Sequence, residues 1–242
     1  MIVINQKRIK IILSCILISL FVFTAKTYNK QNKNDGGENI QTTATPASGK
    51  TIIIDAGHGT PDEGAQSSSG TTEAQTNLKI ALKLQNLLEQ NGSKVILTRS
   101  DNNAIYDLDS KTLKQKKISD IKNRVKIGNG NSADIFVSIH LNKIPQSEYH
   151  GWQCFYNTKN EKSIELAKKI QENLNEAIQK ENTRVAMKLN TVYIMKNIEI
   201  PISIVECGFL SNPEEEKKLL EDSYQDRLAW GIYNGILDYF YN

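Results

Sequence analysis

TIIIDAGHG, residues Thr51–Gly59, is the stretch that decides the predicted fold. Three consecutive isoleucines before Asp55 predict a short strand buried on both faces, as in a parallel sheet. Gly57 and Gly59 flank His58, and glycine lets the backbone turn sharply and pass close to a ligand. Ligands of open α/β sheets bind at the carboxyl ends of strands, so a functional site is expected at Asp55 and His58. An ordinary loop histidine would explain His58 alone, so this hypothesis needs partner residues.

The composition is typical of a globular protein, but charge is distributed unevenly along the chain. The 242 residues carry a net charge of +3 and a hydrophobic content of 39%, enough for a sizeable core. Residues 1–49 hold six basic and two acidic side chains, which leaves residues 50–242 with a net charge of −1. Phosphate binding needs a basic face, so nucleic acid is not expected as the main partner.

The N-terminus predicts a signal or anchor segment over residues 1–25. Ile11–Ala25 is an apolar run after three basic residues. It is shorter than the roughly 20 residues of a membrane-spanning helix but long enough for a signal core or short anchor, and the preceding charge predicts export of the C-terminal part of the chain. A cleavage after Ala25 would put Phe23 where a small residue is expected, which favours an uncleaved anchor. The protein is therefore expected at the extracytoplasmic face of the membrane.

Polar residues 26–49 are predicted to be a flexible linker, and residues 50–242 a single domain. Apolar periodicity in that domain alternates between strand and helix, which predicts an α/β fold with a mostly parallel twisted sheet flanked by helices on both faces. Arg99–Lys117 is predicted to be a loop with room for a short helical piece. The expected strands are Thr51–Asp55, Lys94–Thr98, Asp134–His140, Gly151–Tyr156, Thr191–Met195 and Ile202–Glu206. The expected helices are Glu73–Gln90, Ile118–Asn129, Glu161–Gln179, Pro213–Glu221 and Tyr224–Tyr239.

The domain's two cysteines, Cys154 and Cys207, both lie in strand-like apolar segments. Neither has a Cys or His partner at the close spacing of a zinc clip. Buried free thiols are therefore expected in preference to a disulfide.

Three residues predict a metal site at the carboxyl edge of the sheet. His140 ends the apolar strand ADIFVSIH, and His58 likewise follows the end of the first strand. Glu73 stands at the start of the first predicted helix. A carboxylate in a first helical turn also stabilises the helix dipole, which would explain Glu73 alone. Together, two His and one Glu leave the fourth position of tetrahedral Zn²⁺ open. This donor set favours zinc without deciding against other divalent ions.

Glu206 ends a further apolar strand, PISIVE. Placing an ionisable group at the end of a buried strand is costly unless the group is paired or functional. A carboxylate at the surface rim is the alternative. Beside a metal, Glu206 would be the general base that takes a proton from water and returns it to the leaving amine.

Four motifs in register resemble the zinc-dependent N-acetylmuramoyl-L-alanine amidases of the type 3 amidase family. They are IIIDAGHGTPDEGA, the following Glu73, VSIHLN and VECGFLSNPEE, and the resemblance covers residues 50–242. It implies zinc at His58, Glu73 and His140 and a catalytic carboxylate at Glu206. The substrate that it implies is peptidoglycan, cut at the amide between the lactyl group of N-acetylmuramic acid and L-alanine.

The chain departs from the family pattern in two places. Thr60 replaces the second glycine of HGGxDxGA, with Glu63 before Gly64, and the loop QSSSGTT before Glu73 is rich in serine. Neither departure changes an implied ligand, but both bear on how firmly the site is preorganised.

Within the family, the chain is most similar to sporulation amidases. The similarity rests on the short N-terminal apolar segment, the absence of wall-binding repeats, and the runs RVKIGNGNSADIFVSIHLNKIP and YIMKN. It implies removal of stem peptides so that a deacetylase can form muramic-δ-lactam in the spore cortex. In a spore former, the implied location is the space between the forespore membranes.

Other functions fit parts of the sequence less well. The GHG turn is not followed by the GxxGK[ST] of a nucleotide site. A zinc peptidase that cuts within the stem peptide shares the metal chemistry and stays open. A wall-binding or scaffold protein with a silent zinc site is disfavoured because all four site residues are present. An accessory protein required for activity also stays open, with Arg99–Lys117 and the final helices as candidate docking surfaces.

Overall fold

The computed structural model describes residues 44–178 and 182–241. The predicted signal or anchor segment and the linker up to residue 43 lie outside the described residues. Within the described ranges, no helix has both the length and the apolar character needed to cross a membrane. The contacts of the chain from Ala44 onward form one compact unit. Packing begins before Lys50, because Ala47 is fully buried and Thr45 Oγ1 donates to the carbonyl of Asn91 at 3.0 Å.

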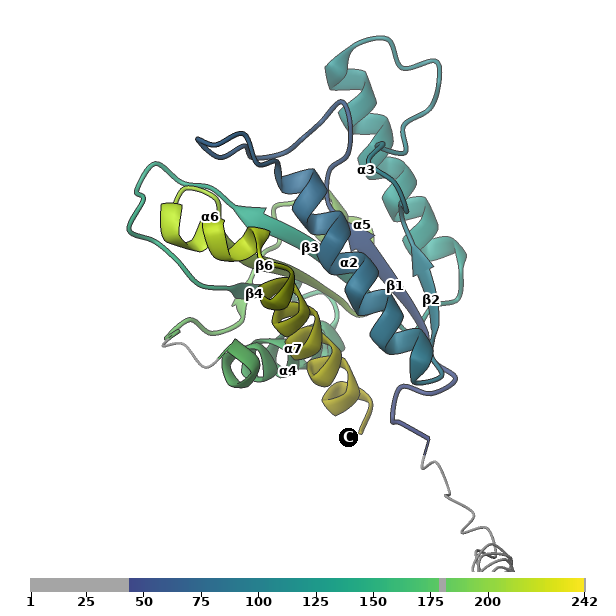
Figure 1. Ribbon diagram of the computed structural model, residues 1–242. Helices are drawn as coiled ribbons and strands as arrows, with labels where there is room; N and C mark the ends of the chain where they lie inside the picture. Colours follow the sequence, from purple (N-terminus) through teal and green to yellow (C-terminus); the bar gives the residue numbers. More distant parts are fainter. Residues whose placement is uncertain (1–43, 179–181, 242) are drawn as a thin grey trace, which may run out of the picture. The chain divides into compact units, whose positions relative to one another are not determined.

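A six-stranded sheet forms the centre of this unit, in the order β2-β1-β3-β6-β4-β5 (Figure 1). β1, β2, β3 and β6 are parallel, whereas β4 is antiparallel to β6 and parallel to β5. The mostly parallel α/β sheet is therefore confirmed. The strands are β1 (Thr51–Ala56), β2 (Lys94–Leu97), β3 (Ile135–Asn142), β4 (Gln153–Tyr156), β5 (Met187–Lys188) and β6 (Ile202–Phe209).

Helices cover both faces of the sheet. α2, α4 and α7 enclose the larger apolar core, and α3 and α5 enclose a smaller one on the other face. Ile52 and Ile54 point into the larger core and Ile53 into the smaller one, as expected for a strand buried on both faces. Cys154 and Cys207 are free and buried, as predicted. The helices are α2 (Glu73–Gln90), α3 (Leu113–Gly130), α4 (Glu161–Ile178), α5 (Tyr193–Asn197), α6 (Pro213–Leu220) and α7 (Asp222–Tyr241).

α3 begins five residues before Ile118, the start that apolar periodicity predicts. The helix begins at Leu113, inside the stretch predicted to be a loop with room for a short helical piece. Thr112 Oγ1 accepts from the backbone N–H of Gln115 at 3.2 Å, and Gln115 Oε1 accepts from the backbone N–H of Thr112 at 3.0 Å. This capping box satisfies two helix-terminal N–H groups. It is a sequence signal for the helix start that apolar periodicity does not contain.

The strand predicted at Thr191–Met195 is wrong. Tyr193–Asn197 is the short helix α5, and the edge strand is Met187–Lys188 instead. A short apolar run does not distinguish a strand from one buried helical turn. Here Ile194 and Met195 are buried in the smaller core, which a helical turn allows.

α4 and α7 pack closely at Gly235. A Cβ at this position would lie 2.4 Å from Ile170 Cα and 2.8 Å from Ile170 N, backbone atoms that cannot swing aside. We expect Gly235→Ala to lower the free energy of unfolding by about 1–3 kcal/mol, because overpacking outweighs the gain in helix propensity. Urea unfolding measures the change.

The matched control is Gly130→Ala at the end of α3, where an added Cβ meets nothing within 4 Å. It should leave stability unchanged or raise it by up to about 1 kcal/mol. Equal stabilities for the two variants would contradict the packing argument.

Candidate metal centre

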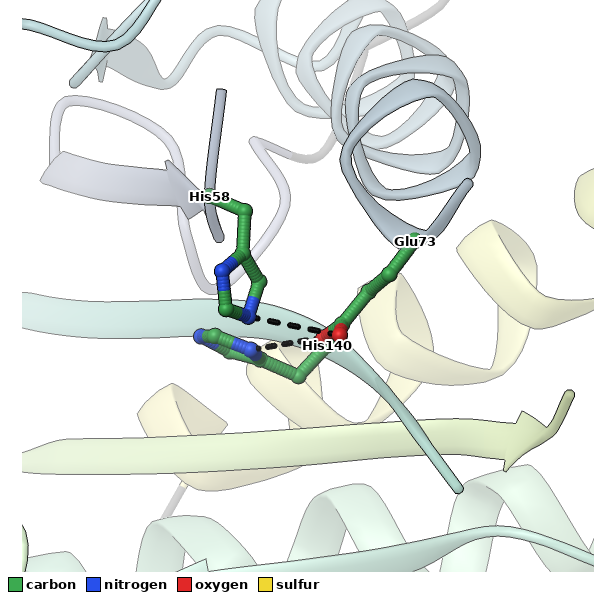
Figure 2. Close-up of side chains that lie close together, drawn as sticks. All are labelled: His58, Glu73 and His140. Atoms are coloured by element: carbon green, nitrogen blue, oxygen red, sulfur yellow. Dashed lines mark hydrogen bonds and ion pairs between the residues drawn. The ribbon is translucent and has the colours of Figure 1, made fainter. Parts of the chain in front are cut away.

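The three predicted metal ligands come together at the carboxyl edge of the sheet (Figure 2). His58 follows β1, Glu73 is the first residue of α2, and His140 lies near the end of β3. His58 Nε2 is 3.3 Å from Glu73 Oε2, and His140 Nδ1 is 3.0 Å from Glu73 Oε1. One ligand atom from each residue lies within 4.8 Å of the other two. Both imidazoles therefore converge on one carboxylate.

Two glycines make room for this convergence. A Cβ on Gly57 would lie 2.3 Å from His140 Cε1. Gly64 has a φ of 69°, and its Cβ would lie 2.6 Å from Glu73 Oε2 and 2.7 Å from His58 Cδ2. The sequence indicated a close approach at Gly57 but no role for Gly64. Any larger side chain at either position would displace a ligand.

Arg124 of α3 holds the backbone that carries His58. Its Nη1 donates to Asp55 Oδ1 at 2.6 Å and to the carbonyl of Ala56 at 2.7 Å, and its Nη2 donates to the carbonyl of His58 at 2.6 Å. Burial would raise the pKa of Asp55, but the charge of Arg124 and hydrogen bonds from neighbouring hydroxyls hold it below its usual value. Asp55 is thus a buried anchor for Arg124.

Arg99 links the same turn to the helix that carries Glu73. Its Nε donates to the carbonyl of Ala56 at 2.8 Å, and its Nη2 donates to the carbonyls of Gly57 at 3.0 Å and Ala74 at 2.7 Å. Ala74 directly follows Glu73 in the first turn of α2. The fork of one guanidinium therefore fixes two ligand-bearing segments relative to each other.

Asp62 orients His58 from the side away from Glu73. Its Oδ2 is 3.3 Å from His58 Nδ1, and Lys117 Nζ is 2.8 Å from its Oδ1. Burial would lower the pKa of His58, but its hydrogen bonds to the carboxylates of Asp62 and Glu73, and their charges, raise it to about 9. Metal-ligating histidines commonly use a carboxylate in this way. Sequence reasoning assigned Asp62 no role, although it stands within the quoted GHGTPDEG motif.

Glu206 lies next to His140, its partner in the β3–β6 register. Its Oε2 is buried and has no hydrogen-bond partner among the described residues. Burial raises the pKa of Glu206 to about 7, against a lowering by the charge of His140. The centre therefore contains a carboxylate with one unpartnered oxygen beside the candidate ligands.

A cleft of about 440 Å³ opens above these groups, on the sheet face covered by α3 and α5. His58, His140 and Glu206 line it together with apolar side chains that include Ile121 of α3 and Tyr193 of α5. A larger cavity of about 710 Å³ lies near the opposite ends of the strands and contains none of the candidate site residues. The first cleft is therefore the one that matches the chemistry.

The family model for N-acetylmuramoyl-L-alanine amidases, Amidase_3, matches residues 52–238. The chain belongs to this amidase family. The resemblance and the enzyme class predicted from the motifs are thereby confirmed.

Individual relatives support the predicted likeness to sporulation amidases. The germination-specific N-acetylmuramoyl-L-alanine amidase of Bacillus subtilis (strain 168) is 38% identical over 195 residues, covering 81% of each chain. The CwlD amidase of Clostridioides difficile, solved in complex with the GerS lipoprotein, is 45% identical with a TM-score of 0.76, covering 78% of this chain and 98% of that one. An N-acetylmuramoyl-L-alanine amidase of Clostridium difficile 630 is 32% identical with a TM-score of 0.69, covering 80% of this chain and 97% of that one.

The raised pKa of Glu206 makes the stability of the metal-free amidase depend on pH. Burial shifts this pKa from 4.5 to about 7. Between these values the folded state keeps a proton that the unfolded state has released, so Glu206 lowers stability as pH rises. By about pH 8, ionised Glu206 costs on the order of 1–3 kcal/mol, which a neutral glutamine avoids.

We therefore expect metal-free Glu206→Gln to be more stable than the wild type at about pH 8, and the difference to shrink toward pH 4. Urea unfolding in the presence of a chelator measures both proteins. A stability difference that does not change with pH would contradict the raised pKa of Glu206.

Proposed function

We propose that the chain hydrolyses the amide between the lactyl group of N-acetylmuramic acid and L-alanine in peptidoglycan, with Zn²⁺ held by His58, Glu73 and His140. The observation that carries the proposal is the convergence of these three side chains beneath the cleft. Glu206, with its unpartnered Oε2, stands next to them. Family membership supports the substrate.

The donor set fits zinc. Imidazole nitrogen and carboxylate oxygen are both zinc ligands, and three of them leave a position open. When bound, zinc acts as a Lewis acid that polarises a carbonyl and lowers the pKa of water. Because the pKa of His58 is about 9 in the metal-free protein, loading at neutral pH displaces a proton from His58. Asp62 then keeps the ring in its ligating orientation.

Glu206 is proposed as the general base and acid. Its Oε2 would accept a proton from the attacking water and return it to the leaving nitrogen of L-alanine. A carboxylate at this position can accept a proton and return it, because its Oε2 has no other hydrogen-bond partner among the described residues. The apolar wall that includes Ile121 and Tyr193 would limit competing water around the scissile amide.

The cellular role that we propose is removal of stem peptides for muramic-δ-lactam formation in the spore cortex. The relative named a germination-specific amidase supports this role. Residues 1–25 would serve as a signal or membrane anchor and place residues 50–242 outside the cytoplasmic membrane. In a spore former, this places the enzyme between the forespore membranes.

We also propose an accessory protein. The C. difficile CwlD amidase was solved in complex with a lipoprotein, and it is 45% identical to this chain. A membrane-attached partner would meet an amidase that acts at the same surface.

The first test is to purify the full chain, measure its metal content, and digest peptidoglycan with and without added Zn²⁺. We expect about one zinc per chain and release of stem peptides that begin with L-alanine. Cuts within the stem peptide would instead establish the zinc peptidase. A protein that stays inactive with zinc bound would favour the scaffold function or a required partner. Activity that appears on adding the GerS lipoprotein of the C. difficile complex would favour the required partner.

The second test is Glu206→Gln. We expect unchanged zinc content and a loss of about 10²–10⁴-fold in kcat, because the proton acceptor is removed and the ligands are kept. Glu172→Gln on the exposed side of α4 is the matched control and should retain wild-type activity. Wild-type kcat in Glu206→Gln would remove Glu206 as the base.

A further inference from the structure

The serine-rich loop at residues 66–72 is tied to α6. Ser69 Oγ donates a hydrogen bond to Glu216 Oε1. The hydroxyls of Ser67 and Thr71 each lie 3.3 Å from Ser69 Oγ, so three hydroxyls gather around one carboxylate. Glu216 is only 6% exposed. A nearly buried charge that is met by hydroxyls from a surface loop is a specific contact.

The residue directly before this loop, Ala65, orients Glu73. The backbone N–H of Ala65 donates to Glu73 Oε2 at 2.8 Å, and the backbone N–H of Glu73 donates to the carbonyl of Ala65 at 2.8 Å. Lys143, which follows β3, donates to the carbonyl of Gln66. The loop therefore starts next to the residue that contacts the Glu73 carboxylate, and Ser69 in its middle contacts Glu216.

α6 is firmly placed relative to Glu206. It follows β6 after a short turn, and Asn212 caps its first turn at 3.1 and 3.0 Å. Glu215 accepts from the backbone N–H of Gly151 at 2.7 Å and of Phe209 at 2.8 Å. The helix dipole favours the negative charges of its first turn. These hydrogen bonds fix α6 relative to β6, the strand that carries Glu206.

We propose that Glu216, acting through Ser69, is a positioning residue that holds the Glu73 carboxylate in place for the metal. The contact joins the loop before one candidate ligand to the helix after the candidate base. It gives a role to the serine-rich loop in which this chain departs from the family pattern. The inference rests on the proposed function, because it takes Glu73 as a zinc ligand.

The test measures zinc affinity of the purified full chain by competition with a chromophoric chelator. The variants are Glu216→Gln and Ser69→Ala, together with the double variant. The controls are Glu214→Gln in the same helical turn and Ser68→Ala in the same loop, both at exposed residues. The thermal midpoint of each metal-free protein is measured alongside.

We expect each single variant to bind zinc about 10-fold more weakly, as is typical when a group supporting a ligand is removed, with the controls unchanged. The double variant should be no weaker than the singles, because both remove one contact. A purely structural role would lower the thermal midpoint and leave zinc affinity unchanged.

Zinc affinity within about twofold of the wild type in Ser69→Ala would overturn the inference, since removal of a supporting group typically costs more. This variant decides the question if Glu216→Gln does not fold. A wild-type protein that binds no zinc would instead overturn the proposed function. The two failures are therefore distinguishable.

Discussion

Two buried guanidinium groups hold the turn that follows β1, and the candidate centre depends on them. His58 has a φ of 62°, a left-handed conformation that is unfavourable for a residue with a side chain. Arg124 and Arg99 compensate by donating to three consecutive backbone carbonyls of this turn. Asp55 at the end of the strand pairs with Arg124, so that charge is not buried alone. Lysine could not replace either fork, because it presents a single nitrogen.

The order of the strands explains why the groups meet. β1, β3 and β6 are adjacent and parallel in the middle of the sheet, so their carboxyl ends share one edge (Figure 1). His140 and Glu206 are register partners on that edge, and α2 starts beside it with Glu73. On the face of α3 and α5, the cleft lies over this edge. Strand order and alternation of side chains thus place the ligands, the base and the cleft together.

Asp55 and Glu206, two carboxylates of this region, differ in what they contribute to stability and to function. Asp55 accepts hydrogen bonds from Arg124 and from hydroxyls, and its pKa is lowered. Glu206 has an unpartnered oxygen, and burial raises its pKa. The first arrangement stabilises the fold and the second costs stability, as is common where a group is kept for chemistry. The same edge of the sheet therefore contains two carboxylates with different roles: Asp55 pairs with Arg124, and Glu206 is the candidate base.

The sequence by itself determined the buried β1 strand, the α/β class and the four candidate site residues, because apolar runs and the residues that end them are local signals. Only the tertiary structure decided that β4 is antiparallel, that Tyr193–Asn197 is helical, and that Arg124, Asp62 and Gly64 support the site. The contact between Arg124 and the His58 carbonyl joins residues 66 positions apart. No periodicity encodes such a pairing, because it arises only when packing brings separate elements to one edge of the sheet.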